Sequence, residues 1–228
     1  MAFNEKSHAF IAARFHFYLT GHFGEKGKKA FIHATQYYAG QRGRRMAQRA
    51  IRDGYPLNPE TYQLYGEWIP TKEMAMANEN HVVDVKSTDP YEIHIFRCPW
   101  HIQFVEMGLN DAGKDYCDHL DCSIYRGFNP EIEFEVIQTL FTDHCCIHKI
   151  NSSGFEENSE GTKKYVQDFE YHCAHSYWAY NEVTGAIFGV KGEEVNSKVL
   201  KDFADAYGLE AADKLAEYKH TNFNIINS

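Results

Sequence analysis

The spacing of apolar residues changes twice along this chain of 228 residues, and the change restricts the folds open to it. Up to about residue 80 apolar side chains recur at helical intervals, as in Ile11, Phe15 and Tyr18. Between about residues 81 and 150 short alternating runs, such as Ile132 and Phe134 among glutamates, are typical of strands. Helical spacing then returns from about residue 165. The pattern predicts an α+β fold with a helical N-terminal part, a small antiparallel sheet of about four strands with flanking helices, and a helical C-terminus.

Local start and stop signals set the expected boundaries of these elements. Gly40 and Gly43 are expected to separate two helices, and Asn58 followed by Pro59 is a typical helix start. The helices are expected at 8–18, 28–40, 44–53, 58–68, 99–107, 111–127, 165–187, 197–207 and 209–219, and the strands at 81–85, 91–97, 132–136 and 145–150.

No internal repeat and no clear linker divides the chain, which indicates a single hydrolase-like α+β domain. Within it, residues 1–80 form the helical part, residues 81–150 form the sheet with the helices of the site, and residues 151–228 form a second helical part. Disorder is expected only near the ends and around Ser152 to Thr162, where small and polar residues accumulate.

The net charge of −9 and the sequence pI near 5.8 argue against a general nucleic-acid binder, which needs a basic face. One basic run is local and is interpreted as a solvated helix face; it consists of Arg42, Arg44, Arg45, Arg49 and Arg52.

The first residues carry charges and histidines where a signal peptide has an apolar region. No apolar run approaches the roughly 20 residues of a membrane span. We therefore expect a cytoplasmic protein that binds neither membrane nor nucleic acid, with its six cysteines present as thiols.

Five of the six cysteines lie between Arg97 and Ile150, and three of them fall on three successive elements. These three, Cys98, Cys117 and Cys146, could therefore meet at one point. Cys117 and Asp121 are four residues apart on one expected helix and share a face. Cys117 is either a nucleophile assisted by that carboxylate or a small buried apolar residue.

A second polar group follows helical spacing further along the chain, at Asp168, His172, His175 and Glu182. His172 could act as a general base with Asp168 fixing its tautomer. The same stripe could instead provide two metal ligands or a solvated helix face.

A zinc site is a further alternative, although no Cys-x-x-Cys pair is present. Its candidate ligands are Cys98, His101, Cys117, Cys146, His148, His172 and His175. We expect no cofactor and leave a zinc or other divalent metal open. Glycine-rich phosphate loops, nucleophile elbows and the His-Glu-x-x-His motif are absent from the sequence.

The order of residues in the central stretch resembles the L-2-amino-thiazoline-4-carboxylic acid hydrolase family. The resemblance is carried by Arg97, Cys98, Glu106, Gly108, Tyr116, Cys117, Asp121, the run from Gly127 to Pro130, Thr139 and Cys146. The chain departs from the family pattern at the hairpin tip, Thr142 to His144, where a glycine is usual. It also departs at His148, where an aromatic residue is commoner.

The resemblance implies a hydrolase that acts on C–N bonds and opens a small cyclic amidine or thiazoline ring, adding water at C2 to give a carbamoyl-cysteine. Asp121 is expected to bind the amidinium, Arg97 the substrate carboxylate, and Cys117 to attack C2 or shape the pocket. His172 is the expected proton-transfer partner. The remaining substrate-binding candidates are Cys98, Asn129, Cys146 and His175.

A different class of function also fits the pattern of helices around a small sheet with clustered cysteines. That class is a small-molecule or metal-binding sensor module of the vinyl-reductase-like type. In either case the expected partner is a small molecule, and a homo-oligomer is left open.

Overall fold

The computed structural model describes residues 3–151 and 164–226, and its architecture is the expected α+β fold. Four antiparallel strands form one sheet in the order β1-β2-β4-β3. They are β1 Val82–Thr88, β2 Tyr91–Arg97, β3 Phe134–Gln138 and β4 Cys146–Ile150. The segment from Ser152 to Thr162, for which disorder was expected, lies outside the described residues.

Two long helices, α1 Glu5–Phe23 and α2 Glu25–Arg52, form the N-terminal part. The expected break at Gly40 and Gly43 is wrong, because α2 continues through both glycines. A Cβ at Gly43 would lie 2.1 Å from the backbone oxygen of Ile124, and one at Gly127 would lie 2.5 Å from that of Gly40. The glycines therefore allow a close helix contact and do not end the helix.

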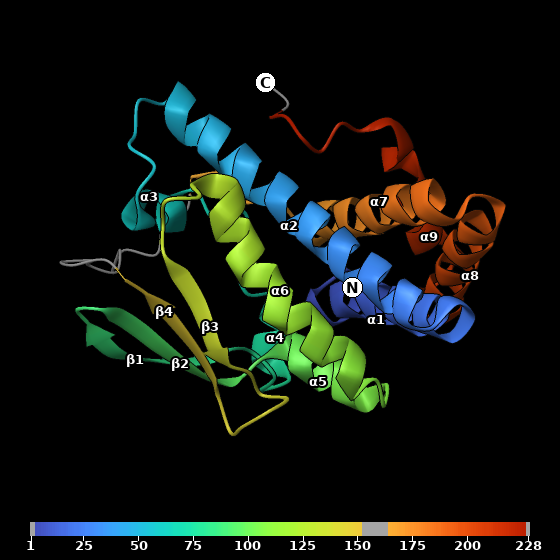
Figure 1. Cartoon of the computed structure of the whole chain (residues 1–228), viewed down its shortest axis with the longest axis horizontal. Coiled ribbons are helices and arrows are strands. Elements are labelled where there is room, and N and C mark those ends of the chain that lie inside the picture. The colour runs from blue at the N-terminus through green and yellow to red at the C-terminus, as the bar shows by residue number, and fades with distance from the viewer. Residues whose placement is uncertain (1–2, 152–163, 227–228) are drawn as a thin grey trace.

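The helix α6, Asn110–Phe128, is central to the molecule: Figure 1 shows it between the sheet and α2. The short α5, Pro99–Glu106, connects it to β2, with Cys98 as the residue before the first helical turn. Two shorter helices, α3 Pro59–Leu64 and α4 Lys72–Met76, occupy the connection from α2 to the sheet. Asn58 caps α3 as expected, accepting the backbone N–H of Thr61 at 3.0 Å.

Three helices complete the described chain on the side of α1 and α2 away from the sheet (Figure 1). They are α7 Phe169–Phe188, α8 Val190–Tyr207 and α9 Leu209–Glu217, with a short turn of 3-10 helix at Tyr218–His220. The sequence placed the start of α7 four residues early, because Asp168 caps the helix and accepts the N–H of Tyr171 at 2.8 Å.

The main hydrophobic core lies among α1, α2, α6, α7 and α8, and aromatic residues such as Phe15, Phe31 and Tyr180 are fully buried in it. A smaller cluster of Tyr91, Tyr125 and Ile150 joins the sheet to α6. None of the described helices combines the length and apolar character that a membrane span needs. The inner face of the sheet and the side of α6 that covers it hold the candidate site.

Candidate functional site

The fold brings three free cysteines together from three different elements. Cys98 lies between β2 and α5, Cys117 lies on α6 and Cys146 begins β4. Ile95 of β2 pairs with Cys146 across the sheet, and the backbone N–H of Leu140 lies 3.3 Å from the Cys146 sulfur. The three thiols lie close enough to act on one another electrostatically.

The thiols of this group are protonated at neutral pH. Burial raises the pKa of Cys98 to about 12 and that of Cys146 to about 11. Burial also raises the pKa of Cys117 well above its ordinary value, and the other two thiols and Asp121 add to the increase. Because a thiolate is the reactive form, the free protein contains no activated cysteine nucleophile at this position.

Asp121 lies one helical turn after Cys117 and is the carboxylate of this group. Its side chain is 36% exposed, whereas that of His148 is only 13% exposed. The Nε2 of His148 lies 3.9 Å from an Asp121 carboxylate oxygen. Burial lowers the pKa of His148 while Asp121 opposes that effect, so the imidazole is neutral at pH 7 and able to accept a proton.

His148 was expected only as a possible zinc ligand and not as a catalytic or substrate-binding residue, although the sequence contained a signal for such a role. Side chains two residues apart on a strand point to the same face, so His148 shares the inner face with Cys146.

His81 lies near His148 and packs against Trp68 and Trp100, at ring distances of 5.4 and 5.5 Å. Burial lowers the pKa of His81 to about 4, and its Nδ1 has no hydrogen-bond partner among the described residues.

Two of the expected substrate-binding residues make their contacts elsewhere. The Arg97 guanidinium donates to the backbone oxygen and the side-chain oxygen of Asn78, both at 2.8 Å. Asn129 ends α6 and donates to the backbone oxygen of Leu57 at 2.8 Å, while its own side-chain oxygen accepts the N–H of Glu131. These contacts hold the end of β2 and the end of α6 in place.

His172 lies in a second polar group, which is organised around the buried Glu67. Its Nε2 lies 3.0 Å from the Glu67 backbone oxygen. A carbonyl only accepts hydrogen bonds, so this nitrogen carries the proton, and the Nδ1 has no partner among the described residues. Burial and the positive charge of Arg42 lower the pKa of His172 to about 3. Glu67, and not Asp168 as expected, therefore fixes the tautomer.

The Glu67 carboxylate is held by two buried arginines of α2. Arg45 donates to both of its oxygens, at 3.1 and 2.7 Å, and Arg49 donates at 2.6 Å. Burial alone would raise the pKa of Glu67, but the guanidiniums, Arg45 first, lower it to about 2. His175 completes the group, with its Nε2 at 2.8 Å from the Gln41 side-chain oxygen.

The interpretation of the basic run as a solvated face is wrong for three of its five members. Arg42, Arg45 and Arg49 are 8%, 0% and 6% exposed, and only Arg44 and Arg52 face solvent. The helical spacing puts the buried three on the side of α2 that faces Glu67.

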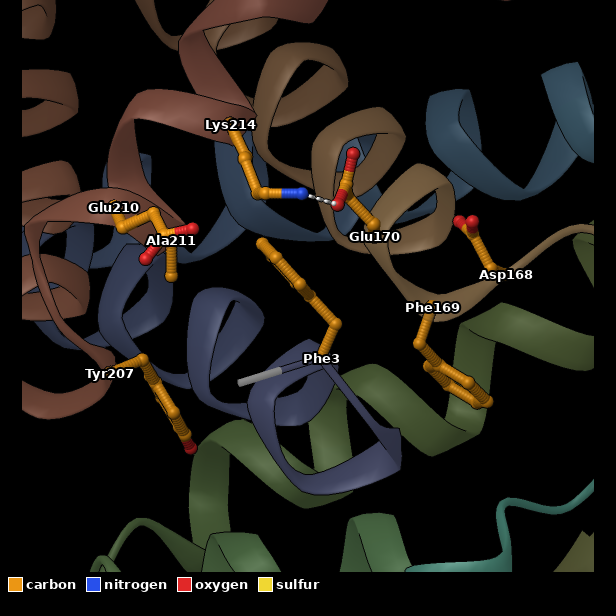
Figure 2. A pocket seen from close by; sticks show the side chains of 8 residues that line it. All are labelled: Phe3, Asp168, Phe169, Glu170, Tyr207, Glu210, Ala211 and Lys214. Carbon is orange, nitrogen blue, oxygen red and sulfur yellow. Dashed lines mark hydrogen bonds and ion pairs between the residues drawn. The ribbon is translucent and has the colours of Figure 1, made fainter. Parts of the chain in front are cut away.

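A surface pocket of about 450 Å³ lies where α7, α9 and the start of the chain meet, and Cys98, Cys117 and Cys146 are not among its lining residues. Figure 2 shows Phe3 in this pocket, below the ion pair between Lys214 and Glu170, whose atoms are 2.7 Å apart. Asp168 and Glu210 make its remaining polar lining acidic. Among the described residues that line it there is no cysteine or serine, and Lys214, the one cation of that lining, is already paired, so the pocket offers little to an anionic substrate.

The side chains proposed as zinc ligands do not assemble into one site. Within residues 3–151 and 164–226, no three His, Cys, Asp or Glu side chains are placed to bind a common metal ion. His172 and His175 belong to the Glu67 group, and the His101 ring packs against Phe141 with the ring centroids 4.7 Å apart.

Comparison with known families adds one finding to this geometry. A family model described as L-2-amino-thiazoline-4-carboxylic acid hydrolase matches residues 4–150. No curated protein and no solved structure matches the chain. The matched segment runs from α1 to β4, so it contains the three thiols, Asp121 and Glu67 but ends before His172.

Proposed function

This chain belongs to the L-2-amino-thiazoline-4-carboxylic acid hydrolase family, and we propose that it opens the ring of a 2-amino-thiazoline-4-carboxylate-like substrate with water. The observation that carries the proposal is the meeting of Cys98, Cys117 and Cys146 beside Asp121 and His148. The group offers one carboxylate, one neutral imidazole and three uncharged thiols. Such a site suits a small cationic ring.

The charge of Asp121 is suited to the amidine part of the substrate. In the protonated ring, C2 is bonded to two nitrogens and one sulfur, and the positive charge makes C2 electrophilic. A carboxylate accepts hydrogen bonds from both nitrogens in a charge-assisted, bidentate contact. Because Cys117 is on the same helical face one turn away, this contact would place C2 near the Cys117 sulfur.

Binding of the substrate would also favour deprotonation of the Cys117 thiol. An amidinium placed between Asp121 and Cys117 introduces a positive charge, which opposes the burial that raises the Cys117 pKa. Neutral His148 is available to take the thiol proton. The Cys117 nucleophile is in this way activated only in the complex.

The proposed reaction has two steps and consumes one water molecule. In the first, a bond forms between the Cys117 sulfur and C2, the bond from C2 to the ring sulfur breaks, and the thiol proton passes through His148 to the departing sulfur. The ring bond that breaks is therefore a C–S bond, whereas cleavage of a C–N bond was expected from the resemblance. In the second, a water activated by His148 adds to the same carbon and the bond to Cys117 breaks. The product is N-carbamoylcysteine, and nothing is oxidised or reduced.

The alternative role of Cys117 is to form a wall of the pocket while water attacks C2 directly. Two substitutions separate these roles. Under the covalent mechanism, Cys117→Ala and Cys117→Ser should both lower kcat by about 10³-fold or more, measured by steady-state turnover of L-2-amino-thiazoline-4-carboxylate.

Cys122→Ser is the matched control, because Cys122 is partly exposed on the same helix and its thiol lies against the backbone oxygens of Asp118 and His119. It should retain wild-type turnover. Near wild-type rates for both Cys117 variants, with the fold verified by circular dichroism, would remove the nucleophile role and leave direct attack by water.

A further inference from the structure

The guanidinium of Arg42 is buried without a full set of partners. The Arg42 side chain is 9% exposed, and its Nε has no hydrogen-bond partner among the described residues. Its nearest carboxylate, that of Glu67, is 3.8 Å away and already receives the hydrogen bonds of Arg45 and Arg49. A buried N–H group without an acceptor is costly, so the Arg42 Nε calls for another acceptor.

The charges of this group do not balance. Arg42, Arg45 and Arg49 contribute +3 and Glu67 contributes −1, which leaves +2 among buried side chains. The nearby His172 is neutral, and no other acidic side chain of the described residues forms an ion pair with these arginines. A bound anion would offset the excess positive charge.

Arg42 lies on α2 next to Gly43, which packs against the backbone of α6 at Ile124, and α6 is the helix that carries Cys117 and Asp121. Tyr62 is acted on electrostatically by both Asp121 and Arg42, and Tyr116 interacts with Arg42, Cys117 and Asp121. Tyr116 is 1% exposed, and its hydroxyl has no hydrogen-bond partner among the described residues. The Arg42 side chain is 9% exposed and that of Asp121 is 36% exposed, so the cation is the more deeply buried of the two charges.

We propose that Arg42 and the Tyr116 hydroxyl bind the carboxylate of the substrate. The proposal rests on the proposed function, because it concerns the other end of the same substrate. A 2-amino-thiazoline-4-carboxylate carries a positive amidinium at one end of its ring and a negative carboxylate at the other. Asp121 and Arg42 present the complementary charges in the same order, and Arg97, the residue expected from the sequence, is bound to Asn78 instead.

The test compares two substrates that differ only in the carboxylate, L-2-amino-thiazoline-4-carboxylate and 2-amino-thiazoline. Arg42→Gln should lower kcat/KM for the carboxylate substrate by about 100-fold, because a buried charge loses its partner. For 2-amino-thiazoline, Arg42→Gln should change kcat/KM by no more than about threefold. This compound has no carboxylate, so Arg42 makes no direct contact with it.

Three further variants make the comparison specific. Tyr116→Phe removes a hydroxyl that has no partner in the free protein, so it should preserve stability and lower kcat/KM by about tenfold for the carboxylate substrate alone. Arg42→Lys keeps the charge and should recover part of the activity lost in Arg42→Gln. Arg44→Gln is the matched control, because Arg44 is exposed on the same helix and bonds to Asn224.

The outcomes separate this inference from the proposed function. Equal losses on both substrates, in Arg42→Gln and in Tyr116→Phe, would show a structural role and overturn the inference while leaving the hydrolase intact. If wild-type protein turns over neither substrate, the proposed function fails, and calorimetric binding of the same two compounds decides the inference. Carboxylate-dependent binding that is lost in Arg42→Gln would support it, and binding that is absent or independent of Arg42 would overturn it.

Discussion

Asp121→Asn is expected to lower kcat/KM for L-2-amino-thiazoline-4-carboxylate by about 10²- to 10⁴-fold. The amide keeps the shape of the side chain but removes the negative charge that would bind the amidinium. It also removes the carboxylate that lies 3.9 Å from the His148 imidazole. Steady-state kinetics at neutral pH, with loss of substrate followed by chromatography, measure the effect.

The control for this substitution is Asp118→Asn, which makes the same chemical change on the same helix at an exposed position. It should retain kcat/KM within about twofold, as expected of a surface substitution. If Asp121→Asn also keeps near wild-type activity, the amidinium does not bind at Asp121 and the assignment of the site is wrong.

Glu67→Gln is expected to reduce the free energy of unfolding by about 3–5 kcal/mol, because it leaves buried arginines without their counter-charge. Glu67 is fully buried and receives hydrogen bonds from Arg45 and Arg49. Urea unfolding followed by circular dichroism measures the loss. Glu170→Gln is the matched control: its partner Lys214 is half exposed, so that pair contributes at most about 1 kcal/mol. A loss in Glu67→Gln no larger than in Glu170→Gln would contradict the account of the buried group.

The same comparison has a pH dependence whose sign follows from the Glu67 pKa. The carboxyl pKa is lowered from its ordinary value of 4.5 to about 2 in the folded protein. Its contribution to stability is therefore complete above about pH 4.5 and is lost as the pH falls toward about 2. The difference in stability between wild type and Glu67→Gln should be constant from about pH 7 to about pH 5 and should shrink below that.

Much of the fold follows from local sequence patterns. The change in apolar spacing predicts the helices and the four-stranded sheet, and the second strand, Tyr91–Arg97, was predicted with the observed bounds. The main error was the break at Gly40 and Gly43. Glycine is a helix breaker in isolation, but here the packing of α6 against α2 requires its small size. A contact between distant segments cannot be recognised from local propensity.

Periodicity predicted contacts within one helix or strand, and the order along the chain indicated that Cys98, Cys117 and Cys146 could meet, but the contacts of the loop residue Glu67 were not predicted. Helical and strand periodicity placed Cys117 with Asp121 and Cys146 with His148. The same periodicity could have shown that Arg42, Arg45 and Arg49 lie on one face of α2. What it could not show is that Glu67, from a loop, would be buried against that face. The sequence therefore favoured Arg97, which is close to the cysteines along the chain but bound to Asn78 in the fold.

The central claim is that this protein adds water to C2 of an aminothiazoline carboxylate and expels the ring sulfur. Wild-type protein incubated with L-2-amino-thiazoline-4-carboxylate in ¹⁸O-labelled water tests it directly, with mass spectrometry of the product and titration of free thiol. The account predicts N-carbamoylcysteine with one labelled carbamoyl oxygen and one new thiol for each substrate consumed. Unchanged substrate in the presence of folded protein, or a ring-opened product with a free amine and no thiol, would contradict it.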